Sequence, residues 1–357
     1  MKHAVLGIIS AVTLVAVQRP GALHEEDQRA FQAQPPRVAA NLENPQEAPG
    51  KSSLSPFDTP LEGYGAGVKG GEGKEVMWVA SAEELTKALS GGDRHIRFKA
   101  GGTFKGPFQI EHPNVTLDGR DAPAPGVTLT GEKGLTIVAR NVVVRNLRVR
   151  DVGLGKKIAD GIKIGSGASD VVVDHCSISN CGDGAIDITD YDQKGVKNIT
   201  VSWCLIGPQH KAMLISQVKG GISIHHNLFY STINRSPNIQ ESPLCDVRNN
   251  TVYNFKLYGM RAEAGTRANF VRNLLLAGAQ TRQPPQSVVV VGEAYAEGNE
   301  GPGEVNKGNL SVPVDAPKVT TQAPREAAKL VLDKAGAFPR DGVDEALLKE
   351  MRGALGP

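Results

Sequence analysis

The sequence predicts an all-β fold: a single-stranded right-handed parallel β-helix (a solenoid) with short helices near its N-terminus and its C-terminus. Three observations support this. An eight-residue pattern recurs through the middle of the chain, and its apolar positions alternate as in a strand with one buried face. Its copies follow one another at short and nearly regular intervals. The 41 glycines and 5% aromatic residues suit many short strands joined by tight turns.

The repeated pattern occurs six times without gaps. The copies begin at Val142, Val171, Ile199, Ile222, Cys245 and Asn269. The third and eighth positions are apolar in every copy. One short strand cannot bury such a face alone, so we expect the copies to stack as coils about 4.8 Å apart, with these positions forming continuous interior columns. Leucine-rich repeats and β-propellers need signature residues that this chain lacks.

The sixth position of the pattern also favours stacking, because successive copies often carry the same residue type there. Its members are Leu147, Cys176, Cys204, Asn227, Asn250 and Leu274. Stacked buried asparagines can hydrogen-bond to one another along such a column. Cys176 and Cys204 would then be interior thiols, and Cys245 takes an apolar first position. A disulfide between Cys176 and Cys181 is the alternative in an exported protein. The absence of CxxC pairs disfavours zinc.

The N-terminus has the features of an export signal. A basic start precedes an apolar run over residues 4–17, which is too short to span a bilayer but typical of a signal peptide. We therefore expect a secreted protein, extracellular or periplasmic, without a membrane span in its mature form, and a monomer. Four segments are expected: 1–22 signal peptide, 23–55 disordered linker, 56–320 β-helix domain, and 321–357 helical tail packed on the β-helix.

Short helices are expected outside the repeats. Ser81 and Glu84 have the spacing of a capping box, which predicts a helix beginning there. Two more are expected over residues 324–332 and after Pro339, the last with Val343, Leu347 and Leu348 on its buried face. The net charge of +2, from 40 basic and 38 acidic residues, comes without a dense basic stripe, so no nucleic-acid partner is expected.

Charged residues collect on a second set of predicted strands, between the repeated ones. Four of them recur at one constant spacing: Lys163, Asp187, Lys211 and Arg235. With equal coil lengths they would form one column on the outer wall, about 5 Å between neighbours. Asp160 and Asp183 each open a D-G turn into a strand at nearly the same spacing, so they should occupy equivalent places on adjacent coils.

These charges suggest a metal and an acidic sugar. Asp160, Asp183 and Asp187 offer oxygen ligands suited to a hard cation, which predicts a Ca²⁺ site. Lys211 and Arg235 would repel each other unless an anion lay between them. A simple ladder of exposed ion pairs does not explain two adjacent cations. A uronate polymer carries one carboxylate per sugar. Its C5 hydrogen can be removed if the developing charge is neutralised by Ca²⁺ and Lys211, with Arg235 as proton acceptor.

Several motifs resemble those of the bacterial secreted pectate lyases of polysaccharide lyase family 1. V-V-V-D-H-C-S-I from Val171 resembles the family's v-W-i-D-H motif, and D-G-A-I-D-I from Asp183 is similar to its calcium-binding stretch. H-K-A-M-L-I from His210 is similar to the segment with the substrate-contacting lysine. N-R-S-P from Asn234 resembles the start of R-x-P-x-x-R. The resemblance covers roughly residues 56–350.

The resemblance implies a Ca²⁺-dependent lyase that cleaves pectate (polygalacturonate), an acidic polysaccharide, by β-elimination. It implies metal ligands at Asp160, Asp183 and Asp187, a substrate-binding and catalytic lysine at Lys211, and the base that abstracts the C5 proton at Arg235.

One position departs from the family pattern. The second arginine of R-x-P-x-x-R falls at Gln240, here a substrate-binding position, and Asn238 stands where arginine is common. Glutamine cannot offer a charged bidentate fork to a carboxylate, so substrate affinity or even activity should be affected. Arg248 or Arg261 is a candidate to compensate.

Two alternatives remain open on sequence alone. Gln240 motivates a non-catalytic polyuronate-binding β-helix protein. A polygalacturonase-like hydrolase could use Asp183 and Asp187 as its acid and base, but the basic pair would then have no role. Adjacent His225 and His226 should point to opposite faces of a strand, which favours a solvent-facing histidine over a metal pair.

Overall fold

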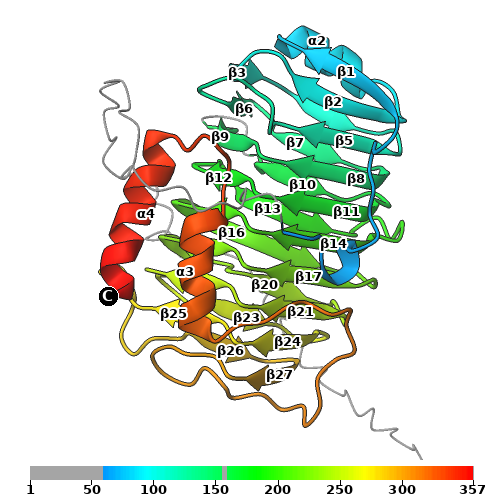
Figure 1. The fold of residues 1–357 in the computed structure, drawn as a ribbon. Helices are drawn as coiled ribbons and strands as arrows, with labels where there is room; N and C mark the ends of the chain where they lie inside the picture. Colours follow the sequence, from blue (N-terminus) through cyan, green and yellow to red (C-terminus); the bar gives the residue numbers. More distant parts are fainter. Residues whose placement is uncertain (1–58, 155–158, 357) are drawn as a thin grey trace, which may run out of the picture. The chain divides into compact units, whose positions relative to one another are not determined.

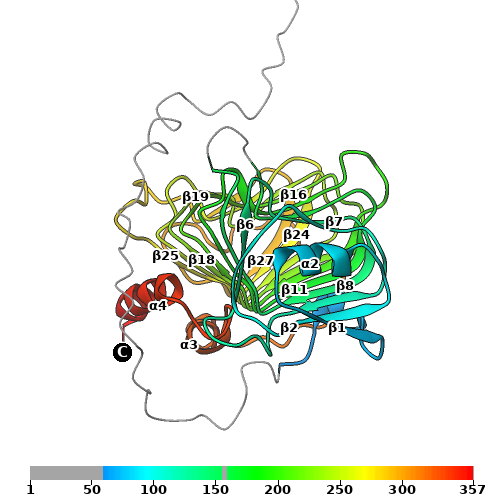
Figure 2. The same cartoon turned by 90° about the horizontal axis from the view of Figure 1, so that it is seen from above.

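The computed structural model describes residues 59–154 and 159–356. Within them the chain winds through three parallel sheets, here called A, B and C, so that most coils add one strand to each sheet (Figure 1). The view along the coils shows strands of successive coils lying over one another (Figure 2). The predicted parallel β-helix is confirmed. The expected signal peptide and linker lie outside the described residues.

The three sheets contain the following strands. Sheet A runs β1 (Glu75–Val79), β2 (Arg94–Phe98), β5 (Val115–Asp118), β8 (Arg140–Arg145), β11 (Ser169–Asp174), β14 (Lys197–Ser202), β17 (Ile222–His225), β21 (Cys245–Arg248), β24 (Arg267–Val271) and β27 (Glu293–Glu297). Sheet B runs β3 (Gly102–Lys105), β6 (Val127–Gly131), β9 (Arg148–Val152), β12 (Ser177–Ser179), β15 (Leu205–Ile206), β18 (Leu228–Tyr230), β22 (Thr251–Tyr253) and β25 (Leu274–Leu276). Sheet C runs β4 (Phe108–Ile110), β7 (Leu135–Ile137), β10 (Ile162–Ile164), β13 (Gly184–Thr189), β16 (Gln209–Ser216), β20 (Asn238–Gln240), β23 (Met260–Ala262) and β26 (Val288–Val290), with β19 (Thr232–Asn234) also paired to β16.

The first four positions of the repeated pattern lie on strands of sheet A, and its last two lie on the following strands of sheet B, so the pattern spans two strands rather than one. Its register holds for the first five copies, which pair first position to first position. The sixth copy is displaced by one residue, because Cys245 pairs with Ala268 rather than with Asn269. Phe270 and Leu275 therefore fill the third and eighth positions, and both are fully buried. The predicted start at Asn269 was wrong because both frames place apolar residues at these positions.

The corrected register lengthens the interior asparagine column, since Asn273 now takes the sixth position. Asn227 Nδ2 donates to Asn250 Oδ1 at 3.0 Å, and Asn250 Nδ2 donates to Asn273 Oδ1 at 3.1 Å. Asn273 Nδ2 continues to Asn299 Oδ1 at 2.9 Å. At the other end the backbone N–H of Cys204 donates to Asn227 Oδ1 at 2.9 Å. Each buried amide thus finds its partner on the next coil.

The cysteines lie in the interior. Cys176 and Cys204 occupy neighbouring coils at the sixth position, as predicted, and Cys245 is buried at a first position. Cys181 is also buried, and all four thiols are free. The alternative disulfide between Cys176 and Cys181 is therefore not formed in the structure.

Helices close one end and cover one side of the coils. Helix α2 (Ala82–Leu89) begins with the predicted capping box: Ser81 Oγ accepts from the backbone N–H of Glu84 at 3.2 Å. Its residue Leu85 is fully buried in the main core cluster. In Figure 1, α2 lies at the β1 end of sheet A.

Helices α3 (Pro324–Lys334) and α4 (Gly342–Leu355) pack on sheet B, where Leu332, Leu347 and Leu348 form a cluster with Leu205 and Leu228 (Figure 1). The helix after Pro339 was expected, and Leu347 and Leu348 are buried as predicted, but Val343 is 41% exposed, so its predicted burial was wrong. No helix among the described residues is long and apolar enough to cross a membrane.

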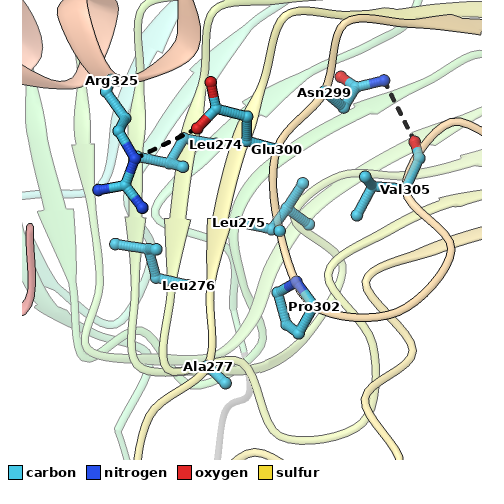
Figure 3. Close-up of a pocket in the computed structure, with 10 residues that line it drawn as sticks. Leu274, Leu275, Leu276, Ala277, Asn299, Glu300, Pro302, Val305 and Arg325 are labelled. Carbon is cyan, nitrogen blue, oxygen red and sulfur yellow. Dashed lines mark hydrogen bonds and ion pairs between the residues drawn. The ribbon is translucent and has the colours of Figure 1, made fainter.

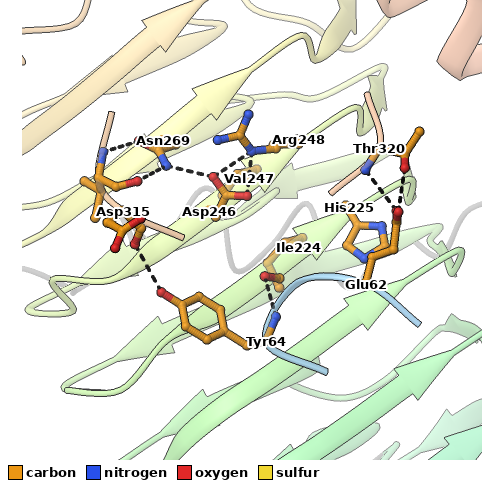
Figure 4. Close-up of polar contacts among 12 residues, drawn as sticks. Glu62, Tyr64, Ile224, His225, Asp246, Val247, Arg248, Asn269, Asp315 and Thr320 are labelled. Carbon is orange, nitrogen blue, oxygen red and sulfur yellow. Dashed lines mark hydrogen bonds and ion pairs between the residues drawn. The ribbon is translucent and has the colours of Figure 1, made fainter. Parts of the chain in front are cut away.

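Two extended segments cover the outer face of sheet A (Figure 4). One contains a single 3₁₀ turn, η2 (Gly63–Gly65), and the backbone N–H of Tyr64 donates to Ser223 Oγ at 3.2 Å. The other lies beside it, where the backbone N–H of Thr320 donates to Glu62 Oε2 at 3.0 Å. Side chains that alternation places on the outside of sheet A are therefore buried.

This cover explains why the histidine prediction was wrong. His225 and His226 are each 1% exposed, and their Nδ1 atoms are 3.0 Å apart. The His226 ring stacks on Trp203 with centroids 4.3 Å apart, and its Nε2 contacts Gln322 Oε1 at 2.9 Å. The pair belongs to the packing between the coils and the covering segments.

Candidate active site

Strands β10 and β13 of sheet C bring the predicted aspartates together. Lys163 pairs with Asp187 in register, as the constant spacing predicts. Asp160 and Asp183, which precede these strands, are offset by one residue rather than equivalent: the backbone N–H of Gly184 donates to Asp160 Oδ1 at 2.9 Å, and that of Asp183 donates to Ala159 O at 3.0 Å.

The predicted column of four charges is broken at β16. Lys211 pairs with Gly184, and the residue opposite Asp187 is Leu214. Leu214 stands three positions beyond Lys211 in the sequence, because this coil is longer than the one before it. Lys211 therefore lies beside Asp183 rather than above Asp187.

Burial and mutual repulsion disturb the two inner carboxyl groups. Burial raises the pKa of Asp160, and the charge of Asp183 adds to the effect. Burial, together with the charge of Asp160, raises the pKa of Asp187 to about 7. Asp187 Oδ1 is buried and has no hydrogen-bond partner among the described residues. Lys163 Nζ is 3.9 Å from Asp160 Oδ2 and relieves only part of this repulsion.

Because Gly184 has no side chain, the carboxylates of Asp160 and Asp187 face the same space. A Cβ added at Gly184 would lie 2.3 Å from Asp187 Oδ1 and 3.1 Å from Asp160 Oδ1. Two convergent carboxylates, one with a partnerless buried oxygen, are hard oxygen donors that suit Ca²⁺ and disfavour a soft metal. Within residues 59–154 and 159–356, however, no group of three His, Cys, Asp or Glu side chains is arranged to hold a metal. The third candidate, Asp183, instead contacts Lys211.

Lys211 and Asp183 form the exposed side of the site. Lys211 Nζ is 2.5 Å from Asp183 Oδ1, and the two side chains are 24% and 35% exposed. An ammonium group at this place can reach both an aspartate of the cluster and an anion arriving from solvent.

Arg235 follows Asn234, which pairs with Lys211, so the two cations approach from adjacent strands. Arg235 has φ +67°, in the left-handed region, and its carbonyl accepts from the backbone N–H of Met213 at 2.6 Å. The charge of Arg235 opposes the rise in the pKa of Asp187. Arg235 therefore acts electrostatically on the aspartate cluster.

Tyr258 was missed by the sequence analysis. Burial raises its pKa to about 12, and the nearby charges of Arg235 and Arg261 oppose that rise. Its ring lies 5.3 Å from the guanidinium carbon of Arg261. It comes from the turn between β22 and β23, which carries no motif, so no signal in the sequence points to it.

Sheet C continues past the cluster through Gln240 and its neighbours. Ser216 Oγ donates to Gln240 Oε1 at 3.5 Å. Asn238 pairs with Arg261 on the next strand, and Asn238 Oδ1 is buried without a hydrogen-bond partner in the described part of the chain. Arg261 Nε is 2.7 Å from Glu263 Oε1.

The two arginines proposed to compensate for Gln240 have different places. Arg261 lies on sheet C, in the column that contains Asp187. Arg248 lies on sheet A, where it is paired with Asp246 at 2.6 Å (Figure 4). Only Arg261 of these two is on the sheet that carries the aspartates.

A cavity of about 540 Å³ lies elsewhere, beside β25 of sheet B. It is lined by leucines and by the turn at residues 299–305 (Figure 3). Glu300 and Arg325 form an ion pair of 3.2 Å at its edge. Its lining contains none of the candidate residues named above, so this cavity is separate from the carboxylates and cations on sheet C.

Comparison with known proteins identifies the family. The family model described as pectate lyase matches residues 58–288, more than half of the chain. The probable pectate lyase C of Emericella nidulans is 29% identical over 319 residues, which cover 81% of this chain and 74% of that protein. The probable pectate lyase C of Aspergillus terreus is 28% identical over 333 residues, covering 82% and 76%.

Solved structures share the fold. A pectate lyase from Bacillus sp. N165 in complex with trigalacturonate has a TM-score of 0.58 at 17% identity, covering 78% of this chain and 98% of that one. Pectate lyase C from Erwinia chrysanthemi, at pH 9.5 with 30 mM Ca²⁺, has a TM-score of 0.56 at 16% identity, covering 78% and 96%. At these identities the likeness concerns the fold alone. With the family match, it follows that the chain belongs to the pectate lyase family and is a polysaccharide lyase.

Proposed function

We propose that this protein is a Ca²⁺-dependent lyase that cleaves pectate by β-elimination, with Arg235 as the base. The observation that carries the proposal is the convergence on sheet C of the buried carboxylate of Asp187 and the partly buried carboxylate of Asp160 with Lys211 and Arg235. The structure of a family member with trigalacturonate supports the choice of a uronate substrate.

Asp160 and Asp187 would hold the calcium ion, with Asp183 as a third ligand. A bound Ca²⁺ would neutralise the substrate carboxylate and so acidify the hydrogen at C5. The partnerless oxygen of Asp187 supports this assignment, because a buried carboxylate oxygen without a donor suits a cation.

The protein side chains then account for the elimination. Lys211, beside Asp183, binds the sugar carboxylate and stabilises the charge that develops on it. The neutral guanidine form of Arg235 accepts the proton from C5 as the C5–H bond breaks, and so becomes a guanidinium cation. The electron pair forms the C4–C5 double bond, and the C4–O4 bond breaks. The departing oxygen takes a proton from solvent, which leaves one unsaturated and one saturated chain end.

Further sugars would follow the strand ladder of sheet C. Strands of successive coils are about 4.8 Å apart, so Arg261 lies about 14 Å along the ladder from Asp187, a distance of a few sugar residues. We propose that Arg261 binds a second uronate carboxylate there, where Gln240 supplies no charge.

Incubation of the protein with polygalacturonate, with Ca²⁺ or with EDTA, tests the proposal. The expected result is an ultraviolet absorbance from the unsaturated product, lost in EDTA and restored by Ca²⁺. New reducing ends without that absorbance would instead indicate a hydrolase. Binding without either signal would indicate the non-catalytic polyuronate-binding protein that Gln240 motivates.

We also propose that the protein is exported, with residues 1–22 as the signal peptide, 23–55 as the linker, 56–320 as the lyase domain and 321–357 as the tail. Support comes from the apolar run at residues 4–17. Mass spectrometry of the protein from the medium or the periplasm tests this. We expect a mature chain that begins near residue 23, and an uncleaved chain inside the cell would contradict it.

A further inference from the structure

Gln209, the first residue of β16, is a buried side chain with no part in the mechanism above. It is 6% exposed. Its Oε1 accepts from the backbone N–H of Cys181 at 2.8 Å. Its Nε2 donates to Cys181 O at 3.0 Å and to Asp183 O at 2.6 Å. The amide thus binds three backbone groups of one turn on the preceding coil.

That turn carries one candidate ligand, leads into a contact with a second and borders the third. It ends in Asp183, whose side chain contacts Lys211. The next residue, Gly184, donates its backbone N–H to Asp160 Oδ1 at 2.9 Å and leaves the space beside Asp187 Oδ1. A shift of the turn would therefore move Asp183 and change the position of the Asp160 carboxylate together.

The three backbone groups that Gln209 contacts require an amide side chain at this position. Both backbone carbonyls need a donor and the backbone N–H needs an acceptor, and a glutamine side chain supplies two N–H groups and one oxygen. A carboxylate would place negative oxygen against two carbonyls, and an apolar side chain would leave three buried backbone groups without partners. A one-carbon-shorter amide would not span the turn.

We propose that Gln209 is a positioning residue of the calcium site: it fixes the turn from Cys181 to Asp183 so that Asp160, Asp183 and Asp187 keep the arrangement that binds Ca²⁺. The inference rests on the proposed function. It extends that function by assigning part of the calcium affinity to a residue that touches neither metal nor substrate.

The test is calorimetric titration of the full-length protein with CaCl₂, comparing the wild type with Gln209→Met. Loss of such a supporting contact typically weakens metal affinity about 10- to 100-fold, and we expect that range. Gln193→Met is the matched control, because Gln193 Nε2 also donates to a turn carbonyl, Asp190 O at 2.8 Å, beyond the other end of β13. Its calcium affinity should stay within about twofold of the wild type.

A second measurement separates positioning from stability. Saturating Ca²⁺ should restore the elimination rate of Gln209→Met, since the defect lies in affinity. Equal calcium affinity in Gln209→Met and the wild type would overturn the inference. So would equal losses in the two glutamine variants, because the effect would then not be specific to the turn from Cys181 to Asp183. A wild type that binds no Ca²⁺ would overturn the proposed calcium site instead.

Gln209→Asn is the second variant, used if Gln209→Met does not fold by circular dichroism. It keeps an amide but is too short to reach both carbonyls, so the same loss of calcium affinity is expected. Unchanged affinity in this folded variant would equally reject the role.

Discussion

At the scale of single residues, the buried carboxylate of Asp187 lowers the stability of the fold at neutral pH, although the proposed calcium site needs it. Burial and the charge of Asp160 raise its pKa to about 7 from an unfolded value of about 3.9. Between these values the folded protein binds more protons than the unfolded chain. In the absence of divalent cations the contribution of Asp187 to stability is therefore fully present below about pH 4 and is lost as the pH rises through about 7.

Replacing Asp187 with asparagine should remove this pH dependence. In EDTA at pH 8 we expect Asp187→Asn to be more stable than the wild type, by on the order of 2–4 kcal/mol, with the difference closing toward pH 4. Urea unfolding at several pH values measures it. Asp333→Asn, at an exposed position, is the control. The account would be contradicted if the unfolding free energy of the wild type rose between pH 4 and pH 7 relative to that of Asp187→Asn.

Gln240 sets a second prediction at the residue scale. Gln240→Arg would add a charged fork on sheet C, so we expect the KM for polygalacturonate to fall about three- to tenfold with little change in kcat. Steady-state kinetics of the unsaturated product measure it. Thr103→Arg adds the same charge at an exposed position of β3 on sheet B and should leave KM unchanged. No change in KM for Gln240→Arg would mean that Gln240 does not face the substrate.

At the scale of elements, the asparagine column stabilises the coils by side-chain hydrogen bonds. Asn250 accepts from Asn227 Nδ2 at 3.0 Å and donates to Ile224 O at 2.8 Å and Asn273 Oδ1 at 3.1 Å. Asn250→Leu keeps the shape but leaves these buried groups unpaired, so we expect a loss of about 2–4 kcal/mol in unfolding free energy. Urea unfolding measures it, and a loss below about 0.5 kcal/mol would show that the column does not stabilise the coils.

The elements also show what a sequence can predict. Alternation and spacing were enough for the sheet A strands and the capping box at Ser81, because both depend on local patterns. The prediction failed where it assumed that all coils have the same length. The column of charged residues ends at Asp187, because the next coil is three residues longer and places Leu214 opposite Asp187. Tyr258 lies near Arg235, and Gln209 contacts the turn of the preceding coil, only because of how neighbouring coils are aligned. A local sequence pattern does not indicate this alignment.

At the scale of the whole described chain, the C-terminal segment is held to sheet B by buried charges. Arg150 Nη2 is 2.8 Å from Asp344 Oδ1 and 3.0 Å from Asp341 Oδ1. Ser177 Oγ donates to Asp344 Oδ2 at 2.7 Å. The sequence predicted the helices from their apolar spacing, but not this docking, because the partners lie far apart along the chain.

Breaking this ion pair should loosen the docking. We expect Asp344→Ala to cost about 3–5 kcal/mol, because it removes one partner of a buried charge, and the pair Arg150→Met with Asp344→Leu to recover most of that loss. Thermal unfolding compares the variants. If Asp344→Ala were as stable as the wild type, the network would not hold α4 to the coils.

The central claim is that Arg235 removes the proton at a site assembled on sheet C, and one variant tests it most directly. Arg235→Ala should lose at least about 1000-fold in the rate of unsaturated product formation from polygalacturonate at saturating Ca²⁺, while its fold by circular dichroism matches the wild type and it still binds Ca²⁺. Elimination at near wild-type rate in this folded variant would contradict the account, because another group would then be the base.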